Sequence, residues 1–138
     1  GGPLPAEQVG QAVLGSLMLR SDGMYEVADV VTAPDFYAEK HRRVFKAMAE
    51  LSEKHEPIDL VSVTGALKAN QELEQIGGSN YLAELAGSVP SSANIKYYAE
   101  IIRKKSALRK LIASAEEIGE LGYNEQEELD SIFDRPVF

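Results

Sequence analysis

The sequence predicts an all-α protein, in which a globular body of six helices is followed by a helical hairpin. Apolar residues recur at spacings of three and four through most of the chain, which places them on one face of a helix. The alternation of apolar and polar residues typical of strands is nearly absent. Proline, glycine and asparagine divide the first part of the chain into short segments, whereas a long segment after Asn94 lacks such interruptions.

Four helices are expected in the first half of the chain. Pro5 suits the first position of a helix, and Ser21-Asp22-Gly23 ends that helix. A short second helix runs from Met24 to Val31, and a third covers roughly residues 38–54. Asp59 is a good N-cap for the fourth, because its carboxylate can accept a hydrogen bond from a free backbone N–H.

Two shorter helices complete the predicted body. A fifth lies around Glu72–Gln75 and stops at Gly77-Gly78, since glycine readily adopts the positive φ that ends a helix. Ser79 is expected to cap the sixth helix, and Pro90 closes it. The inward-facing residues of this sixth helix are predicted to be Tyr81, Leu82 and Leu85. The body therefore comprises residues 5–92.

The hairpin is predicted for residues 93–134. Its first arm, from Asn94 to about Leu121, would extend roughly 40 Å at the rise of an α-helix. Gly122 and Asn124 form the turn, and the second arm begins at Glu125. The apolar stripe of the first arm is Leu108, Leu111, Ile112, Ala115 and Ile118, and that of the second is Leu129, Ile132 and Phe133.

Two helices cannot cover both of these stripes by themselves. The remaining apolar surface must meet the body, a second copy or a partner, and a fully intramolecular hairpin is the alternative. We expect self-association, because a hairpin stripe is easily made self-complementary by two-fold symmetry. The candidate residues for this contact are Leu108, Leu111, Ala115, Leu129 and Ile132.

Composition places the chain among ordinary globular domains. It has 138 residues, 44% of them hydrophobic and 26% charged, which suits a single domain with its own core. It has no cysteine, which excludes disulfides and thiolate zinc sites. No segment approaches the 18 or more apolar residues of a membrane span, and we expect a cytoplasmic protein with no membrane partner.

The charge argues against stand-alone binding to nucleic acid. The formal net charge is −8, whereas proteins that grip phosphates normally present a basic surface. Basic residues do cluster in one short stretch. This cluster has two interpretations: a solvated helix face, or a patch that binds an acidic partner or passing DNA. These residues are Arg103, Lys104, Lys105, Arg109 and Lys110.

We expect no catalytic, cofactor-binding or metal-binding residues. The phosphate-binding pattern G-x-x-x-x-G-K-[ST] does not occur, and Gly77-Gly78 has no lysine after it. The histidines, His41 and His55, lie fourteen positions apart. His41 falls on the apolar face of the third helix and is expected to be packed or hydrogen-bonded, and His55 to be solvated.

Several dispersed motifs, matched in order and spacing, resemble the N-terminal domain of the bacterial replicative DNA helicase, the DnaB-type hexameric helicase family. The resemblance covers about residues 5–130. The matching segments are Ala6-Glu7-Gln8, Val13-Leu14-Gly15, Asp35-Phe36-Tyr37 with His41, Ile58-Asp59-Leu60-Val61, Ile76-Gly77-Gly78, Tyr81-Leu82, Pro90-Ser91-Ser92-Ala93-Asn94 and Arg109-Lys110-Leu111-Ile112.

The resemblance implies a protein-interaction and oligomerisation domain. In this family the domain is all-α, hairpins pair between protomers, and the domains form a collar above the motor ring of a hexamer. The collar docks the C-terminal domain of the primase and sometimes a helicase loader. By matching, the primase contacts would be Tyr81, Ile112 and Ile118. Packing within the body is the alternative role for Tyr81.

The resemblance also places motor activity outside this chain. ATP and Mg²⁺ would act only in a motor domain that is missing here, so we expect no enzyme activity. Residues 1–4 look like a leader or a cloning remnant. At the other end, Pro136 would break the family's second hairpin helix, so residues 135–138 look truncated or foreign, which puts hairpin dimerisation in doubt for this chain.

Two other functions remain open. The helicase-binding domain of a primase shares this fold but would lack the matches at Asp35-Phe36-Tyr37 and Pro90-Ser91-Ser92-Ala93-Asn94. A helical DNA-binding regulatory domain would need a basic recognition helix, and none of the short helices has one.

Overall fold

The computed structural model describes residues 5–89, 94–125 and 128–134, and within them the chain is helical with no strand. The all-α prediction is confirmed. The α-helices are α1 (Ala6–Leu19), α2 (Met24–Val27), α3 (Glu39–Glu53), α4 (Leu60–Ala69), α5 (Gly78–Gly87), α6 (Ile95–Tyr123) and α7 (Leu129–Phe133). Three single-turn 3-10 helices are η1 (Ser21–Gly23), η2 (Ala33–Asp35) and η3 (Glu74–Ile76).

The chain divides into two compact units, residues 1–104 and 105–138. Helix α6 contributes to both. Its first turns belong to the first unit, because Ile95, Ala99 and Ile102 are buried in the core of that unit. The predicted leader, the segment Pro90-Ser91-Ser92-Ala93 and the atypical end at 135–138 lie outside the described residues.

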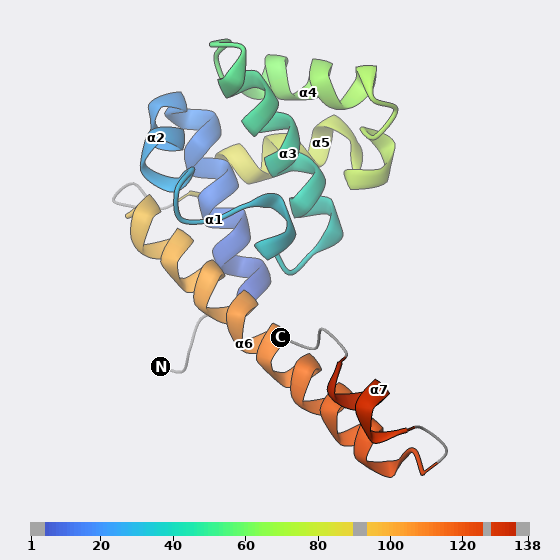
Figure 1. Ribbon diagram of the computed structural model, residues 1–138. Helices are drawn as coiled ribbons and strands as arrows, with labels where there is room; N and C mark the ends of the chain where they lie inside the picture. The colour runs from blue at the N-terminus through green and yellow to red at the C-terminus, as the bar shows by residue number, and fades with distance from the viewer. Residues whose placement is uncertain (1–4, 90–93, 126–127, 135–138) are drawn as a thin grey trace. The chain divides into compact units, whose positions relative to one another are not determined.

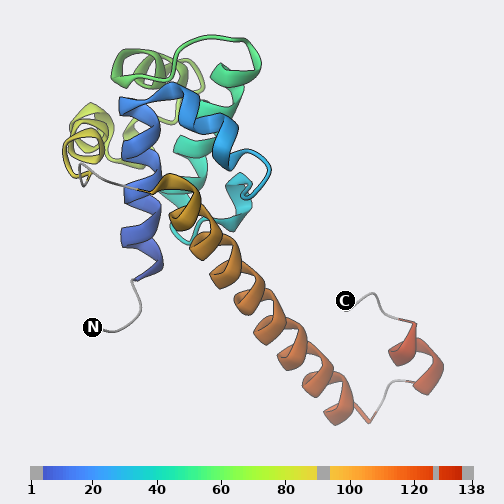
Figure 2. The same ribbon diagram turned by 90° about the vertical axis from the view of Figure 1, so that its left-hand side faces the viewer.

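Helices α1 and α3 form the centre of the first unit (Figure 1). Helix α5 packs on α1, and α4 packs on both α3 and α5. The first turns of α6 lie beside α1 in both views (Figures 1 and 2). The largest fully buried side chains include Phe36, Leu14, Leu17 and Met48. Leu14 and Leu17 lie on α1 and Met48 lies on α3, whereas Phe36 follows η2, and all four join one core.

A glycine allows α1 and α5 to cross closely. A Cβ atom built at Gly15 would lie 2.2 Å from the backbone oxygen of Leu85 and 2.4 Å from a methyl carbon of Val89. No side chain can occupy that space, because the contact is with backbone that cannot rotate away. Gly15 therefore sets the separation at which α5, and the residues it carries, sit on α1.

Helix α4 begins as the sequence predicts. The Asp59 carboxylate accepts a hydrogen bond of 2.7 Å from the backbone N–H of Ser62, which satisfies one of the free donors of the first turn. Ser21 fixes Ile58, the residue before Asp59. The Ser21 hydroxyl donates to the carbonyl oxygen of Ile58 at 2.9 Å and accepts from the Ile58 N–H at 2.7 Å.

The start of α5 differs from the prediction. The helix begins at Gly78 with Gly77 as its N-cap, and Ser79 lies inside the first turn. Gly77 and Gly78 have φ angles of 107° and 76°, the left-handed conformations expected of them. The expectation that Ser79 caps the helix was wrong, because the N-cap position belongs to Gly77, two residues earlier, and Ser79 already lies in the first turn.

Three other helix boundaries also differ. The second helix ends at Val27 instead of Val31, and the fifth predicted helix is the single turn η3 at Glu74–Ile76. The second hairpin arm begins at Leu129, four residues after the expected Glu125. Each of these segments is short, so side-chain packing overrides a weak local preference.

In the described parts of the chain, no helix has both the length and the apolar character needed to cross a membrane.

Candidate interaction surfaces

Tyr81 lies on α5 at the edge of the body core, half-buried and packed against the core cluster. Its phenol oxygen is 2.6 Å from Nε2 of His41 on α3, and the two rings are stacked with centroids 6.1 Å apart. A glycine suits position 77 before Tyr81, because an added Cβ at Gly77 would lie only 3.0 Å from Cβ of Tyr81. The hydrogen bond to His41 and packing against the core therefore hold the Tyr81 ring in place.

His41 is fully buried, as the sequence predicts, and the hydrogen bond to Tyr81 satisfies one ring nitrogen. The other nitrogen, Nδ1, has no hydrogen-bond partner within the described part of the chain. We assign the proton to Nε2, which donates to Tyr81, because a buried N–H without an acceptor would cost more than a bare nitrogen. Burial lowers the pKa of His41 to about 4, and the charge of Lys40 acts in the same direction.

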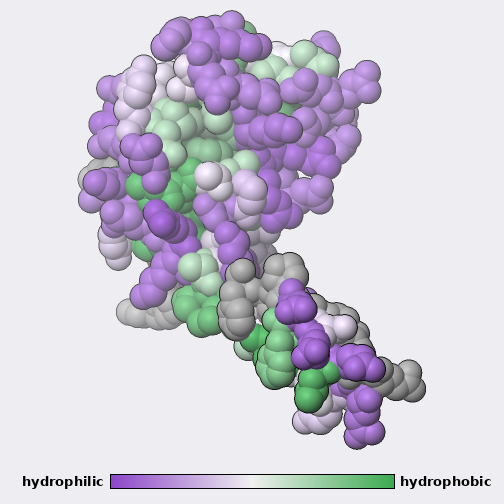
Figure 3. Space-filling view, in the orientation of Figure 1, coloured by the Kyte–Doolittle hydropathy of each residue, from purple (hydrophilic) through white to green (hydrophobic). Residues whose placement is uncertain are grey.

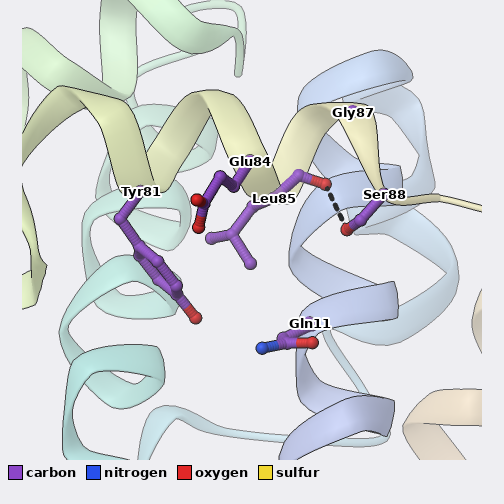
Figure 4. Close-up of a pocket in the computed structure, with 6 residues that line it drawn as sticks. All are labelled: Gln11, Tyr81, Glu84, Leu85, Gly87 and Ser88. Carbon is purple, nitrogen blue, oxygen red and sulfur yellow. Dashed lines mark hydrogen bonds between the residues drawn. The ribbon is translucent and has the colours of Figure 1, made fainter.

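Charged and polar residues surround the Tyr81 ring. The Lys40 ammonium lies 4.4 Å from the ring centroid and pairs with Glu7 at 3.4 Å. Desolvation raises the pKa of the Tyr81 phenol, whereas the Lys40 charge and hydrogen bonding by Gln11 and Lys40 lower it. Figure 4 shows the phenol pointing toward Gln11 on α1. Sequence reasoning did not find Gln11, because only the packing of α1 on α5 brings it to Tyr81.

The second unit contains the other candidate residues. Leu108, Leu111, Ile112 and Ile118 are 48%, 64%, 58% and 41% exposed, and Ala115 is also exposed. At 3.6 residues per turn, all five fall within an arc of roughly 120° around the α6 axis. We call these five residues the α6 stripe. Hydrophobic surface is visible in this part of the chain in Figure 3.

Positions within the α6 stripe separate the two sets of candidates. Ile118 and Ile112 lie at its two edges, and the self-association candidates lie between them. On the second arm, Leu129 is 69% exposed and Phe133 80% exposed, whereas Ile132 is half-buried. Tyr81 belongs to the other unit.

The basic cluster of α6 does not form a one-sided patch. Helical geometry places Arg103 and Lys110 close together in angle, but Lys104, Lys105 and Arg109 then fall on other sides of the axis. A recognition helix for DNA needs its basic residues on the face that enters the groove. This distribution favours the solvated helix face among the two interpretations.

Metal-binding geometry is also missing from the described residues. No group of three or more histidine, aspartate or glutamate side chains is arranged there to hold a metal ion. His55, the second histidine, is exposed in a turn with a φ of 58°.

Known proteins match most of the chain. The model of the DnaB-like helicase N-terminal domain matches residues 4–104. The replicative DNA helicase DnaB of Geobacillus stearothermophilus is 43% identical over 124 residues, which cover 90% of this chain and 27% of that protein. The chain thus spans about a quarter of the length of that relative.

Solved structures of similar fold agree with this match. The crystal structure of the N-terminal domain of DnaB helicase from Mycobacterium tuberculosis superposes with a TM-score of 0.86 at 34% identity, covering 92% of this chain and 90% of that one. A DnaB-like replicative helicase, described with its interactions with primase, gives a TM-score of 0.71 at 32% identity, covering 83% of this chain and 26% of that one. The chain belongs to the DnaB-like helicase N-terminal domain family.

Proposed function

We propose that this chain is the interaction and oligomerisation domain of a replicative DNA helicase, which docks the C-terminal domain of primase and joins copies of the helicase. The α6 stripe is the observation that carries this proposal. Its four large aliphatic side chains are between 41% and 64% exposed in the part of the chain described. Large apolar side chains gathered on one face of a helix mark an interaction surface.

The rest of the replicative function belongs to the remainder of a longer protein. The chain covers 27% of its Geobacillus stearothermophilus relative, which leaves room for a separate motor domain. In this proposal, ATP and Mg²⁺ act only in that motor domain, the complete helicase is a hexamer, and this domain shows no activity alone. A helicase loader uses the same collar in this proposal, and the whole assembly works in the cytoplasm.

The size of the α6 stripe bears on self-association. Burying a large aliphatic side chain completely is worth about 1.5–3 kcal/mol, so covering each half-exposed side chain gives about 1 kcal/mol. Leu108 and Leu111 from two copies would contribute four such side chains, or about 4 kcal/mol, against an association cost of about 4–15 kcal/mol. The stripe alone is therefore marginal. Leu129 and Phe133 of the second arm, which are largely exposed, would add the area that a stable dimer needs.

Primase docking is assigned to Tyr81, Ile112 and Ile118. Two observations support this: the DnaB-like helicase described with primase has a similar fold, and both isoleucines present exposed aliphatic surface. Truncating such an anchor typically costs about 2 kcal/mol in binding, which is roughly thirtyfold in affinity.

Calorimetry with the primase C-terminal domain tests the proposal. Ile112→Ala and Ile118→Ala should each weaken binding roughly thirtyfold. Leu19→Ala is the matched control, because Leu19 is a 64% exposed aliphatic residue on α1. Circular dichroism should show all three variants folded. No detectable complex, or unchanged affinity in both isoleucine variants, would refute the docking role.

Tyr81 needs a different substitution. Tyr81→Ala would remove a half-buried ring and leave both ring nitrogens of the buried His41 without partners, so it would reduce stability as well as any contact. Tyr81→Phe keeps the ring and removes only the hydroxyl. A loss of binding in the phenylalanine variant, with the fold intact, would assign a role to the phenol oxygen itself.

A further inference from the structure

A surface cavity of about 470 Å³ opens between α1 and α5 beside Tyr81. Its lining residues come from the two helices whose crossing Gly15 permits. Figure 4 shows these residues: Gln11, Tyr81, Glu84, Leu85, Gly87 and Ser88.

Among the described residues that line this cavity, the only ionised side chain is an acceptor, the Glu84 carboxylate. Glu84 supplies a carboxylate, which lies between the side chains of Tyr81 and Leu85 in Figure 4. Gln11 supplies an amide oxygen. The Ser88 hydroxyl donates its proton to the carbonyl oxygen of Leu85 at 3.1 Å, so its own oxygen is left to accept. A carboxylate and neutral acceptors around an aromatic ring suit a donor-rich planar cation.

The aromatic wall of the cavity is rigid. The Tyr81 phenol is held by the buried His41 at 2.6 Å, and the residue packs against the core of the body. A ring that is already fixed loses little conformational freedom when a ligand stacks on it.

The local charge also favours a cation. Lys40 lies over the Tyr81 ring, but its charge is offset by Glu7 at 3.4 Å. Together, the side chains of Lys40, Glu7 and Glu84 carry a formal charge of −1. The whole chain carries −8.

We propose that this cavity receives the guanidinium group of an arginine from the docked protein partner, an inference that rests on the docking function proposed above. The guanidinium stacks on the face of the Tyr81 ring that Lys40 does not cover, forms a charge-assisted hydrogen bond to Glu84 and donates to Gln11 or Ser88. Arginine fits better than lysine, because its planar group can stack and donate several bonds at once.

Titration of the isolated chain with Nα-acetyl-arginine amide tests the cavity directly by NMR. The backbone amides of Gln11, Glu84 and Ser88 should shift in the millimolar range. The citrulline analogue, which has the same shape without the charge, should shift them at least tenfold less at equal concentration. No shift at these amides, or equal shifts with the citrulline or lysine analogue, would overturn the proposal.

Two pairs of variants extend the test to the partner. Glu84→Gln should weaken binding of the primase C-terminal domain by about tenfold to a hundredfold, and Glu53→Gln, at the far end of α3 from His41, should not. Gly87→Leu should fill the cavity, whereas Gly65→Leu changes a glycine in the interior of α4. An added Cβ meets nothing within 4 Å at either glycine, so both variants should fold.

The outcomes separate the two proposals. Arginine binding in the cavity without any binding of primase would refute the docking function and leave the cavity's ligand class standing. Primase binding that Glu84→Gln and Gly87→Leu leave unchanged would overturn the arginine contact and leave the docking function standing.

Discussion

The buried His41 should make the free energy of unfolding decrease when the pH is lowered from 7 to 5. Its pKa is about 4 in the folded protein, compared with the ordinary value of 6.5. The unfolded chain therefore takes up the proton first. Stability is complete above pH 6.5 and is lost progressively as the pH falls toward 4, where the loss becomes constant.

The size of this effect follows from the two pKa values. Each pH unit between them costs about 1.36 kcal/mol, so the full loss is about 3.4 kcal/mol, and the loss between pH 7 and 5 is about 2 kcal/mol. Glu39 and Asp59 contribute little in this window. Hydrogen bonds from Arg43 and from Ser62 lower the pKa values of Glu39 and Asp59 below 4.5 and 3.8, so the stability they provide is lost at lower pH.

Urea unfolding followed by circular dichroism between pH 7 and 5 measures the loss. His41→Gln should flatten the curve, because glutamine has no titrating group but can still offer an amide to Tyr81. His55→Gln changes the exposed histidine and should keep the slope. A flat curve in the natural protein, or an unchanged slope in His41→Gln, would refute the reasoning. If that variant does not fold, an NMR titration of the His41 ring in the natural protein is the alternative measurement. A pKa near 6.5 for this ring would also refute the reasoning.

Other predictions concern packing, assembly and activity. Gly15→Ala should destabilise the body by about 1–3 kcal/mol, because the new Cβ would strike the Leu85 backbone. Gly65→Ala should stabilise α4 by up to about 1 kcal/mol, because an added Cβ there meets nothing within 4 Å. Equal urea midpoints for the two variants would contradict this prediction. Leu111→Asp should weaken any dimer in sedimentation experiments and leave the body folded, and a natural chain that stays monomeric at high micromolar concentration would count against hairpin pairing. The isolated chain should hydrolyse no ATP above a contaminant control and should bind no duplex DNA specifically in a gel shift at physiological salt.

Local chemistry explains which parts of the fold could be predicted from the sequence. Asp59 caps α4 because an aspartate side chain reaches the N–H three residues ahead whatever the rest of the chain does. Gly77 takes a left-handed conformation that other residues rarely adopt. The long run of α6 contains enough turns to show its periodicity clearly. In each case the signal lies within one continuous segment of the chain.

The Tyr81 site could not be predicted in the same way. His41 and Tyr81 are forty positions apart, and their contact exists only because α3 and α5 pack in one core. The close approach at Gly15 depends on the path of α5, and Gly15 gives no sign of it in the sequence. The cavity beside Tyr81 follows from that crossing and was likewise not predicted.

The three primase candidates are ordered before any partner binds, each for a different physical reason. Tyr81 is held by a hydrogen bond to a buried histidine. Ile112 and Ile118 are β-branched residues within a helix, which restricts them largely to one side-chain rotamer. Ordering a free side chain on binding would cost about 0.5–1.5 kcal/mol, so these residues can give most of their contact energy to the complex. An exposed lysine of the basic cluster would have to lose its rotamer freedom at that step, which makes it a weaker anchor than a prepositioned apolar residue.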